Sequence, residues 1–350
     1  MPLPPKIVRR LILGPLALAL SVAFVGLAPV LFLGAAITDL ALSRRRWQTV
    51  RVAAFAEAYL LVEIAGLVAL FVLWIASGFG LTMKSERMRR AHYGLLRGLL
   101  AATNGAARRL FRMKIWIEER PEPKPGPILV FSRHAGPGNS LMLVGTLMIG
   151  YRRDPRIVML AKLQWEPLFD TMLNRLPNRF IQHDARNRQR YVDMIGELAG
   201  GLGEHDAFVL FPEGHDFTYV KRLKAIAHLK RKGYHEQALK AERMERVLPP
   251  RHGGVMTAIT AAPQADVVFV AHTVLEDIGT FRDLWHRVPF EAPILSRYWR
   301  IPPEEVPRER DQLIEWLFEW WERIDGWIEQ RRATTPSPEP APTVAGPAPG

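Results

Sequence analysis

The sequence contains no cysteine. This absence excludes disulfide bonds, zinc sites built on thiolates and a cysteine nucleophile. Acidic residues are also in deficit, because 35 Asp and Glu residues face 47 Lys and Arg residues and leave a formal net charge of +12. A basic protein favours anionic partners. We find no nucleic-acid-binding module, and much of the basic charge flanks apolar segments. We therefore expect an anionic phospholipid membrane as a partner, and no nucleic acid.

Charge is absent altogether from two stretches near the N-terminus, Leu11–Thr38 and Ile64–Met83. The first is longer than the roughly 20 residues that a bilayer-spanning helix needs. Basic residues precede it, as in a signal peptide, but the apolar region of a signal peptide is only about 7–15 residues long. We therefore predict that residues 1–90 form a helical hairpin. This hairpin would anchor the chain in the cell membrane and keep the catalytic part on the cytoplasmic side.

Basic clusters lie before, between and after the two apolar stretches, at Lys6–Arg10, Arg44–Arg51 and Lys84–Arg90. Two complete spans would place the middle cluster on the opposite side from the other two, against the positive-inside rule. A hairpin that enters only one leaflet would keep all three clusters cytoplasmic. Pro15 and Pro29 interrupt its first arm. Both topologies remain open at this point.

The rest of the chain alternates short apolar runs with helical patterns. Residues 91–126 are predicted as a helical linker that ends in a Pro-rich turn. Strands are then predicted at Ile128–Ser132, Ile157–Ala161, Arg179–Gln182, Ala207–Phe211 and Val267–His272, and helices at Pro137–Ile149, Arg188–Leu202, Lys221–Arg231 and Gly254–Ala262. This alternation predicts an α/β domain over residues 127–332, with a mostly parallel central sheet flanked by helices.

Two features close the chain. Apolar residues between Leu313 and Ile328 recur at helical spacing. They predict either a helix packed on the domain or a Trp-rich helix at the membrane interface. The tail, residues 333–350, is rich in Pro and Ala and is expected to be disordered.

Three candidate functional residues, His134, Glu213 and His272, fall at or just past the ends of predicted strands. Because sites in parallel sheets lie at the carboxyl ends of strands, we expect these residues to converge. A helix N-terminus near His134 favours a neutral imidazole, which suits a general base. The side-chain oxygen of Asn139 is expected to accept from the other ring nitrogen and fix the tautomer.

Several blocks occur in one order along the chain: SRHAGPGNS, AKLQWEP, RFIQHD, FPEGH and VVFVAH. Together they resemble the glycerolipid acyltransferases of the 1-acylglycerol-3-phosphate acyltransferase (PlsC-like) family over roughly residues 128–300. H-A-G-P-G, F-P-E-G and V-L-P-P-R are similar to its actinobacterial-type branch. The resemblance implies a membrane-associated O-acyltransferase of phospholipid biosynthesis or remodelling. It would move an acyl chain from acyl-CoA or acyl carrier protein to a hydroxyl of a lysophospholipid or glycerolipid.

The resemblance also implies roles for individual residues. His134 would be the general base, assisted by Asn139, and no metal or bound cofactor would be needed. The residues expected to bind the acceptor, with the basic ones reaching its phosphate, are Glu213, Gly214, Lys162, Arg179, His183, Arg186 and His215.

The sequence departs from the family pattern at three places. Asn139 stands where the family has aspartate, His183 where it has arginine, and His215-Asp216 where Thr-Arg is common. If Asn139 serves the imidazole, Asn139→Asp is expected to raise kcat. A degenerate member that binds lipid or acyl-CoA without turnover is the main alternative. A serine hydrolase that uses Ser132 or Ser140 is a second alternative, but neither residue lies in a G-x-S-x-G elbow.

Overall fold

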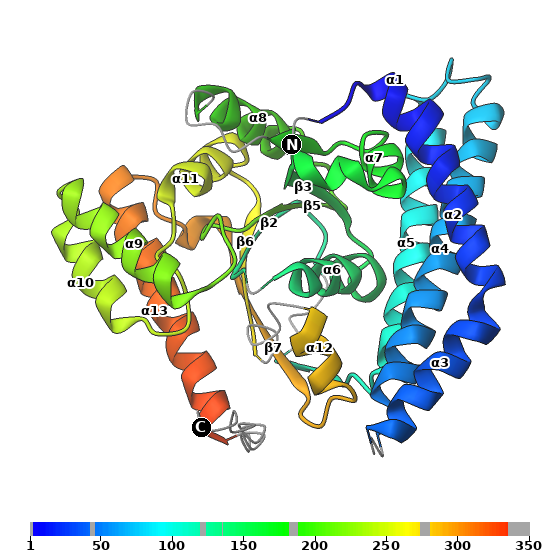
Figure 1. The fold of residues 1–350 in the computed structure, drawn as a ribbon. Helices are drawn as coiled ribbons and strands as arrows, with labels where there is room; N and C mark the ends of the chain where they lie inside the picture. Colours follow the sequence, from blue (N-terminus) through cyan, green and yellow to red (C-terminus); the bar gives the residue numbers. More distant parts are fainter. Residues whose placement is uncertain are drawn as a thin grey trace, which may run out of the picture.

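The computed structural model describes residues 3–42, 46–119, 124–134, 136–181, 188–273 and 281–334. Within these residues, one seven-stranded sheet has the order β1-β7-β6-β2-β5-β3-β4 and is flanked by helices (Figure 1). The strands are β1 (Ile115–Glu118), β2 (Ile128–Ser132), β3 (Asp154–Leu160), β4 (Arg179–Ile181), β5 (Asp206–Leu210), β6 (Asp266–His272) and β7 (Ile294–Ile301). Neighbours are parallel except for β6 and β7. The predicted, mostly parallel α/β fold is therefore confirmed.

The centre of the sheet positions the candidate site. Strand β2 lies between β5 and β6 and runs parallel to both, with Val130 paired to Val209 and to Val268. Every residue of β2 and β5 is buried, because helices cover both faces of the sheet, and this explains their continuous apolar sequences. Since the three strands run in the same direction, the segments that follow them meet at one edge of the sheet.

Side chains of alternate residues along the central strands pack into two layers. Leu129, Phe131 and Phe208 face the larger core, which also contains residues of α8 (Arg188–Gly200), α11 (His252–Ala261) and α13 (Arg310–Thr334). The alternate residues of these strands face α6 (Pro137–Gly145) and the π-helix Thr146–Gly150. Helices α9 (Tyr219–Arg231) and α10 (His235–Arg243) pack against each other beside α13 (Figure 1).

Helix α13 is part of the core. Trp321 is completely buried, and Trp320 stacks on Phe269 of β6 with 4.8 Å between the ring centroids. A fully buried large apolar side chain stabilises the fold by about 1.5–3 kcal/mol. Of the two interpretations of this segment, packing on the domain is confirmed, and a helix at the membrane interface is wrong.

Two helices near the N-terminus, Lys6–Gly26 and α4 (Gln48–Ala76), are long and apolar enough to cross a membrane. The first contains α1 (Lys6–Val8), the π-turn Arg9–Leu13 and α2 (Gly14–Gly26), and α3 (Ala28–Ala41) follows. Pro29 lies in the first turn of α3 and lacks an N–H, so it cannot continue the hydrogen-bond ladder of α2, which ends at Gly26. Large apolar side chains of these helices are exposed, as expected for contact with lipid.

The hairpin contacts the domain at both of its ends (Figure 1). At one end the buried Arg9 donates to Gln164 Oε1 and to Asp170 Oδ1, each over 2.9 Å, and Asp170 lies in α7 (Pro167–Leu173). At the other end, Trp285 Nε1 of α12 (Phe281–Arg287) donates to Thr49 Oγ1 over 3.1 Å. Helix α4 therefore lies along the domain for most of its length.

The segment predicted as a helical linker contains a helix and a strand. Helix α5 (Glu86–Leu110) begins before residue 91 and packs on α4, and β1 pairs with β7. The signals of β1 and β7 were weak, because β1 has four residues and β7 carries two arginines. Of the predicted tail, residues 335–350 lie outside the described residues.

Candidate functional site

His134 follows β2 at the carboxyl edge of the sheet, just before α6. The backbone N–H of Arg133 donates to the carbonyl of Val270 over 3.3 Å and extends the pairing of β2 with β6. Gly136 then turns the chain with a φ of 135°, a conformation that favours glycine. The imidazole of His134 stacks on Phe211 with 4.6 Å between centroids and an interplanar angle of 29°. Its side chain is 23% exposed.

Glu213 holds the segment after β2 to a second loop. It is 1% exposed. Its Oε1 accepts from the backbone N–H of His134 over 3.2 Å, and its Oε2 accepts from that of Leu248 over 3.1 Å. Burial raises the pKa of Glu213 to about 8, although the Arg133 charge and the two backbone donors act in the opposite direction. Both oxygens accept from backbone N–H groups, so Glu213 joins the segment after β2 to the loop that contains Leu248. Its contact with the acceptor stays a prediction.

Arg133 links the end of β6 to the segment that follows β2. Its buried guanidinium donates to the carbonyl of His272 over 2.9 Å and to that of Arg246 over 2.8 Å. The predicted convergence of His134, Glu213 and His272 is therefore seen, but Arg133 makes the connection. No pattern in the sequence indicated a role for Arg133, because arginine is rarely buried unless it is paired.

Asn139 does not occupy the position that its spacing predicted. It is completely buried, and its Nδ2 donates to the carbonyl of Arg133 over 2.9 Å. Its Oδ1, the atom expected to accept from the imidazole, has no hydrogen-bond partner among the described residues. A carboxylate at this position could not donate to the Arg133 carbonyl. The expectation that Asn139→Asp raises kcat therefore loses its basis.

The acid beside the imidazole is Asp216. Its Oδ1 lies 3.2 Å from Nδ1 of His134. The oxygen lies off the direction of the ring N–H, so the pair is a close contact rather than an aligned hydrogen bond. In the sequence, Asp216 stands out as a departure from the family pattern and not as a partner of His134. Its position next to FPEGH, a loop expected to reach His134, was the signal that could have identified it.

The charges around His134 favour its neutral form. Burial lowers the pKa of His134, Asp216 acts to raise it, and Lys221 and Lys162 lower it further. A lowered pKa leaves the imidazole unprotonated at neutral pH, as the sequence predicted for a general base. Lys162, in the 3-10 turn Ala161–Trp165, was predicted as a site residue, and Lys221 of α9 was not.

Gly214 and Arg251 form another part of the site. Gly214 has a φ of +71°, and a Cβ added there would lie 3.1 Å from the Arg251 guanidinium carbon. Glycine favours this turn and leaves room for Arg251, the arginine of the V-L-P-P-R block. His215 is half-buried in the same loop.

Arg179 lies away from His134. Arg179 begins β4, and its guanidinium contacts Glu197 of α8 over 3.4 Å. Two strands separate β4 from β2, which places their axes about 14 Å apart. His183 and Arg186 lie outside the described residues. Among the described residues, no group of three or more His, Asp or Glu residues is arranged to hold a metal ion.

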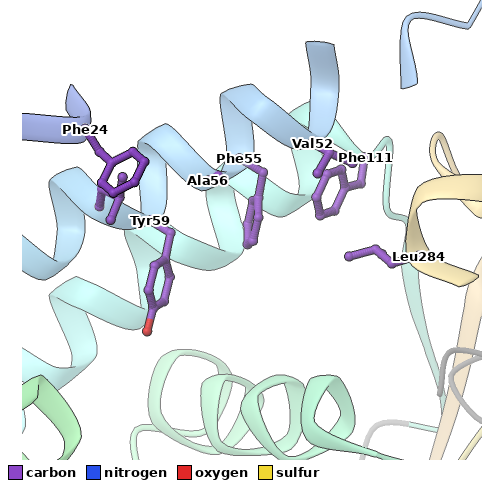
Figure 2. Close-up of a pocket in the computed structure, with 8 residues that line it drawn as sticks. Phe24, Val52, Phe55, Ala56, Tyr59, Phe111 and Leu284 are labelled. Carbon is purple, nitrogen blue, oxygen red and sulfur yellow. The ribbon is translucent and has the colours of Figure 1, made fainter. Parts of the chain in front are cut away.

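An apolar cavity of about 500 Å³ lies beside α4, between the hairpin and the domain. Figure 2 shows Tyr59, Phe55 and Phe111 in a row, with Leu284 of α12 nearby. Phe24, Val52, Ala56 and Leu60 complete the lining. A cavity lined in this way accepts apolar groups, because a polar ligand would lose its hydrogen bonds to water there.

Comparison with models of known protein families finds no match, and neither does comparison with curated protein sequences. Among solved structures, the chain is similar to the 1-acyl-sn-glycerophosphate (LPA) acyltransferase PlsC from Thermotoga maritima. The two share 14% sequence identity with a TM-score of 0.43, over 76% of this chain and 98% of the other.

Proposed function

We propose that the protein is a membrane-associated O-acyltransferase that acylates a hydroxyl of a lysophospholipid or glycerolipid. The supporting observation is the environment of His134, an imidazole kept neutral by burial and by two lysines and in close contact with Asp216. This environment suits a base that takes the proton of an alcohol. The order of the sequence blocks around it adds the substrate class, since it resembles that of glycerolipid acyltransferases.

The reaction would proceed by direct transfer. His134 takes the proton of the acceptor hydroxyl while the hydroxyl oxygen attacks the thioester carbonyl of acyl-CoA or acyl carrier protein. The carbon–sulfur bond then breaks, the thiolate leaves with its electron pair, and the ester remains on the acceptor. One base suffices because a thiolate is a good leaving group, and the proton held by His134 returns to the thiolate or to water.

Basic residues near His134 are the candidates for the acceptor phosphate. Lys162 and Lys221 act on the imidazole electrostatically, so both lie within range of a bound anion. Arg251 lies over Gly214 in the adjacent loop. His215, and His183 and Arg186 in the segment outside the described residues, remain predictions. A 1-acylglycerol 3-phosphate is the simplest acceptor of this kind.

We place the hairpin in one leaflet of the cell membrane, with the catalytic domain cytoplasmic. Both ends of the hairpin are hydrogen-bonded to the same domain, which would be difficult if α4 crossed the bilayer. Because the chain lacks cysteine, Arg46→Cys introduces a unique thiol at the turn of the hairpin. Labelling only after cell lysis supports the one-leaflet topology, and labelling from outside intact cells contradicts it.

The apolar cavity beside α4 is our candidate position for an acyl chain. Its lining comes from the hairpin and from the domain, so a lipid tail could reach it directly from the leaflet. Filling it with Ala56→Trp should reduce the use of long-chain donors more than that of short-chain donors. Equal effects on both would argue against this position.

The most informative experiment incubates the purified protein in detergent with radiolabelled acyl-CoA or acyl carrier protein and a panel of lysolipids. We expect labelled product with at least one lysolipid, and none with His134→Ala. Binding of lipid or acyl-CoA without product would favour the alternative of a degenerate member that does not turn over. Loss of activity on treatment with a serine-directed fluorophosphonate would favour a hydrolase.

A further inference from the structure

The loop after β5 encloses His134 on several sides. The backbone N–H of His134 donates to Glu213 Oε1 over 3.2 Å, and its carbonyl accepts from the N–H of Phe217 over 3.1 Å. Phe211 stacks on the ring. Residues 211–217 therefore hold the backbone of His134 and cover one face of its imidazole.

Asp216 is the member of this loop that contacts a ring nitrogen. Its Oδ1 lies 3.2 Å from Nδ1 of His134, and its backbone carbonyl accepts from Lys221 Nζ over 3.1 Å. The side chain is 48% exposed, so its carboxylate can rotate into line with the ring N–H. Hydrogen bonds of catalytic groups are often poorly aligned before substrate binds and tighten in the complex.

Asn139 does not supply a carboxylate to the imidazole of His134. Its amide donates to the carbonyl of Arg133, and it sits at the position that the resemblance assigns to an aspartate. Asn139, five residues after His134, is uncharged, and the carboxylate beside the imidazole is that of Asp216, in the loop that contains Glu213. In this chain the imidazole comes from the segment after β2, and the carboxylate that contacts it comes from the loop after β5.

We propose that Asp216 is the positioning residue for His134: its carboxylate accepts the N–H of Nδ1, which leaves Nε2 unprotonated to take the proton of the acceptor hydroxyl. The inference rests on the proposed function of His134. When the imidazolium forms, the Asp216 carboxylate compensates its charge, and the proton taken from the acceptor stays on Nε2 until the thiolate has left.

Three charged groups from three elements act on the imidazole: Asp216 from the loop, Lys221 from α9 and Lys162 from the turn at Ala161–Trp165. The Asp216 charge raises the pKa of His134, and the two lysines lower it. Removing only the carboxylate charge should therefore move the acid limb of the pH–rate profile to lower pH. This shift reports the carboxylate charge, and the ring tautomer reports the hydrogen bond to Nδ1.

Asp216→Asn tests the proposal in the full-length protein. We expect kcat to fall by about 10²-fold or more, towards the roughly 10⁴-fold loss known for the equivalent change in a serine-protease triad, with KM little changed. The acid limb should move to lower pH, and Asp216→Glu should recover part of the rate. Asp193→Asn, which removes a surface aspartate of α8, is the matched control and should leave both unchanged.

A second measurement is independent of turnover. Imidazole ¹⁵N spectra, with His134 assigned through the loss of its signals in His134→Gln, report which ring nitrogen carries the proton. We expect protonated Nδ1 in the wild type and a shift towards protonated Nε2 in Asp216→Asn. A wild-type His134 protonated at Nε2, or an Asp216→Asn variant with unchanged kcat and acid limb, overturns the proposal. The expected tautomers in a protein without transferase activity would support the positioning and reject the proposed function.

Discussion

The backbone N–H of His134 donates to the Glu213 carboxylate over 3.2 Å, so a residue of FPEGH holds the candidate base by its main chain. The other carboxylate oxygen accepts from Leu248. Glu213→Ala removes the acceptor of both donors. Leaving a buried donor unpaired costs about 1–3 kcal/mol, so we expect thermal denaturation to show a loss of at least that size together with reduced kcat. Glu197→Gln, which removes an exposed partner of Arg179, should lose at most about 1 kcal/mol.

The raised pKa of Glu213 also predicts how stability depends on pH. Burial raises the pKa of folded Glu213 to about 8, above its ordinary value of 4.5. The folded state therefore binds this proton more tightly than the unfolded state, and the resulting stability is complete below pH 4.5 and lost as pH rises towards 8. Tm of the wild type should fall over this window, and Tm of Glu213→Gln should fall less. Parallel curves would show that Glu213 is ionised throughout.

Lys221 offers a test of the electrostatics around His134. Its charge lowers the pKa of the imidazole, so Lys221→Met should raise that pKa and move the acid limb of the pH–rate profile to higher pH, by up to about one unit. In the wild type this limb should lie below pH 6.5, because the pKa of His134 is lowered from that value. Lys224→Met, on the same helix, is the control and should leave the limb in place. A limb unmoved by Lys221→Met would mean that another group controls the rate.

Comparing Gly214→Ala with Gly233→Ala separates the effect of backbone strain on activity from the effect of displacing Arg251. Both glycines have positive φ, +71° and +79°, but only at Gly214 would a Cβ meet the Arg251 guanidinium. Each substitution by alanine should cost about 1–2 kcal/mol of stability through the backbone. Gly214→Ala should in addition lower kcat/KM, by up to about 10²-fold if Arg251 positions the acceptor. Equal activity in the two variants would remove Arg251 from the site.

The central fold was predictable because burial on both faces leaves an unmistakable apolar pattern. The predicted ends of β2, β5 and β6 agree with the structure to within one residue. Their continuous apolar sequences are typical of strands that are covered by helices on both faces. Strand β7 carries Arg297 and Arg300 and has no such pattern. Its position depends on pairing with β6 rather than on its own composition.

In the site, only the positions of residues that directly follow strands could be predicted. His134 and Glu213 follow parallel neighbouring strands, so their proximity followed from the topology. The contact of Asp216 with the imidazole depends on how a loop folds back over the sheet edge, and spacing along the chain contains no information about that. Asn139 showed the same limit, because five residues of spacing did not determine which way its amide points.

The most direct test of the proposed transfer measures the free CoA thiol and the acylated lipid that form in the same reaction. With purified protein, acyl-CoA and an accepted lysolipid, the wild type should produce the two in equal amounts. His134→Ala should lower both by about 10²–10⁴-fold without changing Tm. Thiol released without acylated lipid, or His134→Ala activity within about twofold of the wild type, would contradict a transferase that uses His134 as its base.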